Sequence, residues 1–149
     1  MNQDFVDLLR EFSDHDVDFL VVGAHALAAH GHVRATKDLD LWIRPTAKNA
    51  ARAYRALGAF GAPLTGLEER DLATPGTVFQ IGVPPVRIDI LTRIDGVVFS
   101  KAWKEKVPAT VGGVGVFVLS RAHLILNKKT AGRLQDLADV ERLERPDDD

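Results

Sequence analysis

Three aspartates on two predicted strands have the spacing of a site for divalent metal ions. Asp38 and Asp40 are one residue apart in the alternating stretch 37–43, and Asp89 lies in a later strand, 86–91. Residues i and i+2 of a strand point to one side, with Cα atoms ~6.5 Å apart. Their carboxylates can therefore converge on a pair of metal ions ~3.5–4 Å apart. Mg²⁺ is the expected ion, because it prefers oxygen ligands and keeps positions open for water and phosphate; Mn²⁺ is the second candidate.

The same aspartates also fit a structural interpretation without a metal site. An alternating strand needs polar residues on its exposed face, and Asp-x-Asp is found by chance in many proteins. Aspartate is nevertheless depleted from strands, so two on one face favour a functional site. Asp89 lies on the opposite face of its strand from Ile88 and Ile90, so it can join the pair if the two strands are neighbours. Asp89 would then ligate one metal ion and act as a base toward an attacking hydroxyl.

A glycine turn upstream of the aspartates could bind phosphate. The predicted strand 17–22 ends at Gly23, and a helix over 24–30 follows it. Glycine permits a tight turn, and the free N–H groups at the start of a helix attract anions. Gly23 and Ala24 are the candidate phosphate-binding residues. Taken alone, the turn is an ordinary strand-to-helix connection; combined with three aspartates, it suggests nucleotidyl transfer.

Four further residues are candidates for the phosphate end of the site. Arg34 and Thr36 alternate with Asp38 and would share its face if the strand begins early. Arg34 could then contact phosphate and Thr36 could orient an acid, although strand propensity explains Thr36 equally well. In the C-terminal segment, Lys128 is a candidate ligand of the β- and γ-phosphates, with Arg133 beside it. The alternative is a solvated helix surface with local ion pairs.

Hydrophobic periodicity and turn residues predict the elements that must position these side chains. The predicted helices are 4–12, 24–30, 47–56, 120–129 and 133–143, and the predicted strands are 17–22, 37–43, 77–81 and 86–91, with a hairpin over 110–118. Strands 77–81 and 86–91 are expected to be antiparallel neighbours. On helix 47–56, Ala51, Tyr54 and Leu57 are expected on the buried side. We expect one domain over 1–149, with a core of about 1–119 and C-terminal helices of about 120–144.

Composition narrows the functional classes. The 149 residues are 46% hydrophobic, which is enough to form a hydrophobic core. The net charge of -2 and the pI near 6.2 argue against a broadly basic surface that coats nucleic acid. The absence of cysteine excludes disulfides, thiolate zinc sites and cysteine nucleophiles. No apolar run approaches the ~20 residues that span a bilayer, and the first residues lack the pattern of a secretory signal. A cytoplasmic protein without a membrane partner is expected.

The candidate residues also carry a family resemblance. Residues 21–26, with 30–31, 34–36 and 38–40, resemble the opening motif of small bacterial nucleotidyltransferase-like proteins. These are similar to the AbiEii/MenT group of toxins, within the DNA polymerase β-like superfamily. Residues 80–89 resemble the segment with that family's third acid, and residues 125–140 resemble its C-terminal Lys…Arg-x-x-Asp-x-x-Asp segment. The segments occur in the family's order and span most of the chain.

The resemblance implies an α/β nucleotidyltransferase fold, with a mixed sheet flanked by helices. It implies Mg²⁺, an NTP donor, and transfer of a nucleoside monophosphate to a tRNA or protein acceptor with release of pyrophosphate. It also implies a toxin role with a cognate antitoxin as partner. Two departures weaken the expected nucleotide affinity: Ala24 stands where the family often has serine or glycine, and Gln135 stands where a lysine often precedes the aspartate.

The sequence therefore predicts a magnesium-dependent nucleotidyltransferase. The first alternative is a nucleotide-binding or regulatory module that keeps the fold with weakened catalysis, and Ala24 is the departure that motivates it. The second is a protein whose main activity is contact with an antitoxin.

Overall fold

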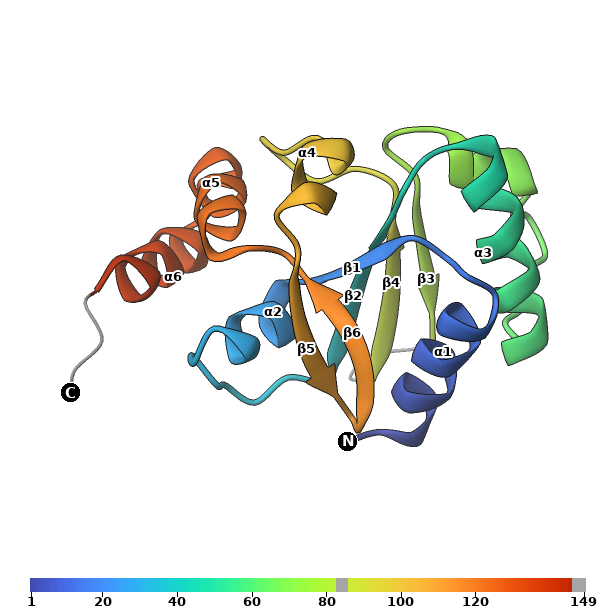
Figure 1. Cartoon of the computed structure of the whole chain (residues 1–149), viewed down its shortest axis with the longest axis horizontal. Helices are drawn as coiled ribbons and strands as arrows, with labels where there is room; N and C mark the ends of the chain where they lie inside the picture. Colours follow the sequence, from blue (N-terminus) through green and yellow to red (C-terminus); the bar gives the residue numbers. More distant parts are fainter. Residues whose placement is uncertain (83–85, 146–149) are drawn as a thin grey trace.

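The chain forms one six-stranded mixed sheet with helices on both faces (Figure 1). The computed structural model describes residues 1–82 and 86–145. The strands are β1 (Phe19–Val22), β2 (Asp38–Ile43), β3 (Val78–Ile81), β4 (Arg87–Leu91), β5 (Val107–Val111) and β6 (Val114–Val118), in the sheet order β3-β4-β2-β1-β6-β5. The predicted α/β class with a mixed sheet is confirmed.

Six α-helices and one 3₁₀ helix occur in the described part of the chain. They are α1 (Gln3–Asp14), α2 (Gly23–Ala29), α3 (Ala47–Phe60), η1 (Glu69–Ala73), α4 (Phe99–Lys104), α5 (Arg121–Ala131) and α6 (Leu134–Glu144). The last two helices extend away from the sheet on the side opposite α1 and α3 (Figure 1). None of the helices in the described ranges is long and apolar enough to cross a bilayer.

The strand pairing places the predicted site at the centre of the sheet. β2 lies between β1, its antiparallel neighbour, and β4, its parallel neighbour. β3 pairs antiparallel with β4, as the sequence predicts; of the turn between them, residues 83–85 lie outside the described residues. β5 and β6 form the predicted hairpin, but it begins at Val107 and not at residue 110. Pro108 lies in this edge strand, where the missing N–H does not break a ladder. Because proline usually argues against a strand, the sequence placed the start of the hairpin too late.

The core between α1, α3 and the sheet is apolar. Phe12 of α1 packs edge-to-face on Phe19 of β1, with ring centroids 5.3 Å apart. The prediction for the buried side of α3 was wrong in part: Leu57 is buried, but Ala51 and Tyr54 are only half-buried. The fully buried face instead contains Asn49, Ala50, Ala53 and Ala56. This helix is rich in alanine and therefore presents two overlapping apolar stripes, which periodicity does not distinguish.

Candidate active site

The structure brings the three predicted aspartates together on one face of the sheet. Asp40 of β2 and Asp89 of β4 are Cα partners across the parallel pair, and Asp38 is the partner of Arg87. Residues directly opposite each other in neighbouring strands share a face, so Asp38, Asp40 and Asp89 project to the same side. Asp38 and Asp40 are half-buried, whereas Asp89 is only 8% exposed.

The local electrostatics disfavour ionisation of two of these carboxyl groups. Burial raises the pKa of Asp40 to about 6, with further contributions from the negative charges of Asp89 and Asp38. The pKa of Asp89 is also raised, mainly by burial, although the guanidinium of Arg87 opposes the shift. Nε of Arg87 lies 3.1 Å from Oδ1 of Asp89. Neither atom has a well-directed hydrogen bond within the described ranges, so this ion pair compensates the buried charge only in part.

The donor chemistry of the cluster fits a hard divalent cation. Three carboxylates supply oxygen ligands of the kind that Mg²⁺ and Mn²⁺ prefer. A cation would offset the burial and the neighbouring negative charges that raise the pKa of Asp40. No three His, Asp or Glu side chains of the described residues already converge closely enough to enclose a metal ion. Binding would therefore require rotation of side chains. Asp38, Asp40 and Asp89 are the candidate ligands.

Gly23 is the residue that lets Asp40 occupy its position. Its φ of 68° lies in the left-handed region, where glycine is favoured. A Cβ added at Gly23 would overlap Oδ2 of Asp40 and would lie 3.2 Å from its Cγ. Gly23 is also the first residue of α2, and the residue before it, Val22, provides no side-chain cap, so no cap side chain covers the start of this helix beside the carboxylate. This arrangement joins the predicted phosphate turn to the predicted metal ligands.

Two adjoining clefts meet at the carboxylates. The larger one has a volume of about 640 Å³ and contains all three aspartates together with Arg87. The smaller one, of about 300 Å³, is lined by the α2 turn and by the segment that enters β2, including Ala24 and Thr36. The residues common to both clefts are Gly23, Asp38, Asp40, Lys128, Arg133 and Asp136. A substrate could therefore approach the carboxylates from two sides.

Thr36 and Arg34 do not extend the face of β2, because this strand begins only at Asp38. The Thr36 hydroxyl instead accepts a hydrogen bond from the Asp38 N–H (3.2 Å), so it fixes the backbone at Asp38 and not a carboxyl group. The Arg34 guanidinium donates to Oδ1 of Asp139 at 2.8 Å. Both residues line the smaller cleft, but Arg34 is held there by a carboxylate of α6.

Lys128 is buried, so the alternative interpretation of a solvated helix surface does not hold at this position. It is 6% exposed, and its Nζ lies 2.8 Å from Oδ2 of Asp139 and 3.6 Å from Oδ1 of Asp136. Burial by itself would raise the pKa of Asp139, but hydrogen bonds from Lys128 and Gln135 and the charge of Arg34 hold that pKa below its ordinary value. The two aspartates therefore stay ionised and keep Lys128 at the wall of both clefts.

Arg133 reaches the clefts from the start of α6. Its Nε donates to Oδ2 of Asp136 at 2.7 Å, while its side chain is 79% exposed. Burial would raise the pKa of Asp136, but the hydrogen bond and the charge of Arg133 lower it overall. The exposed part of the Arg133 guanidinium can bind an anion in the cleft, while Asp136 fixes the other edge of the group.

Three residues of the site had no role in the prediction from sequence, although Asp136 and Asp139 belong to the C-terminal Arg-x-x-Asp-x-x-Asp segment. Arg87 stands two positions before Asp89 in the same strand, and this period-two spacing is the signal that could have identified it. Asp136 and Asp139 are 3% and 1% exposed. Their i, i+3 spacing on a helix places them on one face, but only the tertiary structure shows that this face is covered by Lys128.

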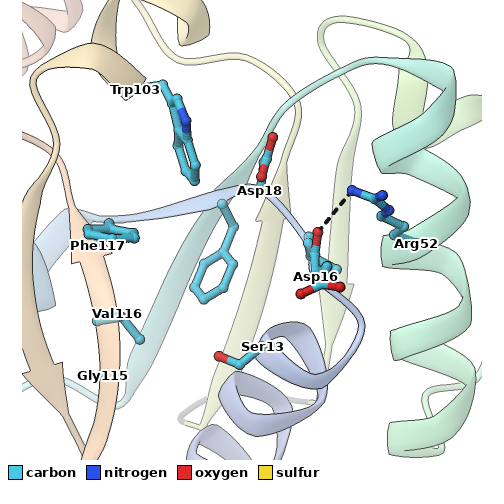
Figure 2. A pocket seen from close by; sticks show the side chains of 10 residues that line it. Ser13, Asp16, Asp18, Arg52, Trp103, Gly115, Val116 and Phe117 are labelled. Atoms are coloured by element: carbon cyan, nitrogen blue, oxygen red, sulfur yellow. Dashed lines mark hydrogen bonds between the residues drawn. The ribbon is translucent and has the colours of Figure 1, made fainter.

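A separate cleft of about 360 Å³ lies between the end of α1, α3, α4 and β6 (Figure 2). Trp103 and Phe117 stand on one side of it, and Asp16 and Asp18 on the other. Arg52 donates a hydrogen bond to the backbone carbonyl of Asp16 at 3.4 Å. None of the predicted site residues lines this cleft, so it is distinct from the candidate active site.

Comparison with known proteins identifies the fold. No protein-family model and no curated protein matches this sequence. Among solved structures, the lincosamide antibiotic adenylyltransferase LnuA, bound to lincomycin, superposes with a TM-score of 0.62 at 12% identity over 97% of this chain and 96% of that chain. The antibiotic-resistance factor ANT(2'')-Ia gives a TM-score of 0.63 at 12% identity, over 95% and 80% of the two chains.

A Thermotoga maritima protein assigned as a nucleotidyltransferase gives a TM-score of 0.61 at 14% identity, over 93% of this chain and 88% of its own. These matches cover almost the whole of the chain. They do not address the AbiEii/MenT subgroup, which stays a prediction. The chain has the fold of the nucleotidyltransferases, as its sequence predicts.

Proposed function

We propose that this protein is a metal-dependent nucleotidyltransferase. The observation that carries the proposal is the pairing of Asp40 with Asp89, beside Asp38, in a cleft that also contains cationic side chains. Nucleotidyl transfer requires anionic metal ligands and cationic phosphate ligands within one small volume. The nucleotidyltransferase fold of the chain supports the same reaction.

Each side chain has a proposed role. Asp38, Asp40 and Asp89 would hold Mg²⁺, or Mn²⁺, which supplies Lewis-acid stabilisation of phosphate charge when bound. The N–H groups of Gly23 and Ala24 would bind phosphate oxygens. Arg133 is placed to contact the triphosphate with its exposed face, whereas Lys128 and Arg34 contribute positive potential from fixed positions, because Asp139 holds both of them.

The transfer itself is an in-line displacement at the α-phosphorus of an NTP. The oxygen of an acceptor hydroxyl forms a bond to this phosphorus, and the bond to the oxygen that bridges to the β-phosphate breaks. Pyrophosphate leaves, and the hydroxyl proton passes to Asp89. A carboxylate with a raised pKa is a stronger base than an exposed one, and the pKa of Asp89 is raised by burial. The protein contributes chiefly positioning and charge stabilisation.

Two classes of acceptor and one biological role are candidates for this protein. The family resemblance favours a tRNA or protein acceptor and a toxin controlled by an antitoxin. A small-molecule acceptor is the second candidate: LnuA is an adenylyltransferase of lincosamide antibiotics, and a mostly apolar cleft of this chain shares Ile94 with the carboxylate cleft. Growth arrest on expression of the wild type, and its absence with Asp38→Ala, would support the toxin role.

The proposal is tested with α-labelled NTPs. Each labelled NTP is incubated with the protein, Mg²⁺, and total tRNA or a cell extract, which contains protein and small-molecule acceptors. We expect one acceptor class to become labelled by the wild type and not by Asp40→Ala. If label is never transferred while calorimetry shows tight nucleotide binding, the weakened nucleotide-binding module is the correct interpretation and Ala24 is the first residue to revert to serine.

A further inference from the structure

The active-site face of β2 continues past the carboxylates to Trp42. Trp42 follows Asp40 by two residues on this strand, so its Cα lies ~6.5 Å further along the same face. A cleft of about 430 Å³ opens beside Trp42. Ile94 lines both this cleft and the larger carboxylate cleft. We call the 430 Å³ cleft the Trp42 pocket.

The walls of the Trp42 pocket are mostly apolar, with Thr92 and Arg93 as the polar residues that line it. Pro45, Pro75, Val97 and Phe99 line it, and Phe99 packs edge-to-face on the Trp42 indole with ring centroids 4.9 Å apart. A ligand that fills this space has to present hydrocarbon or ring surface, because unpaired polar groups are costly to bury.

One buried donor at the pocket has no partner within the described residues. Arg93 also lines the pocket, but its side chain is 66% exposed and its Nη2 lies 3.9 Å from Oδ1 of Asp95. The Thr92 hydroxyl is used within the fold: it donates to the Thr74 carbonyl at 2.7 Å and accepts from the Thr77 N–H at 2.8 Å. Trp42 is 1% exposed, and its Nε1 has no hydrogen-bond partner among the described residues. Buried indole N–H groups are normally paired. An acceptor atom of a ligand that reached this buried N–H would pair it.

The turn that forms one wall is held in place by α5. Asn127 Nδ2 donates to the backbone carbonyl of Asp95 at 3.0 Å. Gly96 packs so closely on Thr130 that an added Cβ would lie 2.9 Å from the threonine Cβ. Asn127 also lines the carboxylate cleft. The pocket wall and the phosphate side of the active site are therefore fastened to the same helix.

We propose that the Trp42 pocket binds the apolar ring portion of a small acceptor molecule, with Trp42 Nε1 donating to a single acceptor atom on it. This inference rests on the proposed function. The reacting hydroxyl of the bound molecule would then lie at Asp40 and Asp89, about two residues along the strands from Trp42. A nucleobase is a poor occupant, because its edges carry several donors and acceptors, whereas the buried walls offer a single unpaired donor and Arg93 is mostly exposed. The inference thus favours a small amphipathic acceptor over tRNA.

The binding test uses the indole N–H signals of the full-length protein, which has tryptophan only at positions 42 and 103. Acetophenone is the probe, since it has one ring and one carbonyl acceptor; ethylbenzene has the same ring without the acceptor. We expect acetophenone to move the Trp42 resonance saturably, and ethylbenzene to bind about tenfold more weakly. Trp42→Phe should lower acetophenone affinity about tenfold as well. Trp103→Phe, which assigns the spectrum, should leave it unchanged.

The acceptor assignment is tested by label transfer to the small-molecule fraction of a cell extract. We expect transfer to fall as acetophenone fills the pocket, while Mg²⁺-NTP binding in calorimetry is unchanged. The inference is overturned if acetophenone gives no saturable shift of Trp42, or if transfer proceeds at full rate with the pocket saturated. A failure of the proposed function is separately visible as absent Mg²⁺-NTP binding, which would remove the acceptor assignment but not the probe shift.

Discussion

Asp40 of β2 and Asp89 of β4 face each other as Cα partners across a parallel strand pair, and both carboxyl groups point into one cleft. Burial and the negative charges of Asp89 and Asp38 oppose ionisation of Asp40, and burial and the charge of Asp38 oppose ionisation of Asp89. Active sites commonly carry such unfavourable charge in return for reactivity. The candidate site should therefore lower the stability of the protein when no metal ion is bound.

Replacing Asp40 with asparagine should stabilise the protein at neutral pH. The pKa of Asp40 is raised from 3.8 to about 6, so between about pH 4 and 6 the folded state keeps a proton that the unfolded chain releases. The free energy of unfolding consequently falls as pH rises through this window. Asparagine does not ionise, so the free energy of unfolding of Asp40→Asn should be about 2 kcal/mol higher than that of the wild type at pH 7.5. Urea unfolding at pH 4 and pH 7.5 measures the difference, which should vanish at the lower pH.

Binding of Mg²⁺ should weaken on acidification. Because Mg²⁺ requires the ionised carboxylate and the pKa of Asp40 is about 6, binding at pH 5 has to displace a proton. We expect Mg²⁺ affinity to be about tenfold lower at pH 5 than at pH 7.5, measured by calorimetry in two buffers of different ionisation enthalpy. An affinity independent of pH would show that Asp40 is not a ligand.

Adding a methyl group at Gly23 should displace Asp40 and remove metal binding. The new Cβ would overlap Oδ2 of Asp40, and the left-handed backbone would cost about 1 kcal/mol in addition. Gly31→Ala is the matched control, since Gly31 has a φ of 92° but no atom within 4 Å of the added Cβ. Thermal unfolding with and without Mg²⁺ should show stabilisation by the ion in Gly31→Ala and none in Gly23→Ala.

Breaking the buried ion pairs of α5 and α6 should be costly. Asp139→Asn removes the carboxylate that holds Lys128 and Arg34 at 2.8 Å each, and it leaves the buried Lys128 short of a counter-charge. We expect a loss of about 3 kcal/mol in urea unfolding. The control is Glu144→Gln, which breaks a half-exposed pair with Lys129 and should change stability by less than about 0.5 kcal/mol. Similar effects of the two substitutions would contradict the buried network.

Period-two alternation was enough to place the carboxylates on strands and on the correct faces. It identified Asp38 and Asp40 as one set and Asp89 as a possible third member, because side-chain direction in a strand depends only on local geometry. The adjacency of β2 and β4 is different. It depends on pairing between strands that are far apart in the chain. The sequence therefore predicted only that Asp89 would join the pair if the two strands were neighbours.

The cationic side of the site was less predictable for the same reason. Lys128 lies in a helix whose own sequence gives no sign of burial; Asp136 and Asp139 cover it only after α6 folds back on α5. The partner of Arg34 is 105 residues away in the chain. Local patterns identify which residues carry charge, but they do not identify which charges neutralise each other.

Two labels on one NTP would show whether Asp38, Asp40 and Asp89 support transfer of a nucleoside monophosphate. With Mg²⁺ and a responsive acceptor, the α-label should move to the acceptor and the γ-label should leave in pyrophosphate. Asp40→Asn and Asp89→Asn should lower α-label transfer at least ~100-fold. Asp18→Asn, at the separate cleft, should leave it unchanged. Undiminished transfer by Asp40→Asn, or movement of the γ-label to the acceptor, would show that these carboxylates do not support nucleotidyl transfer.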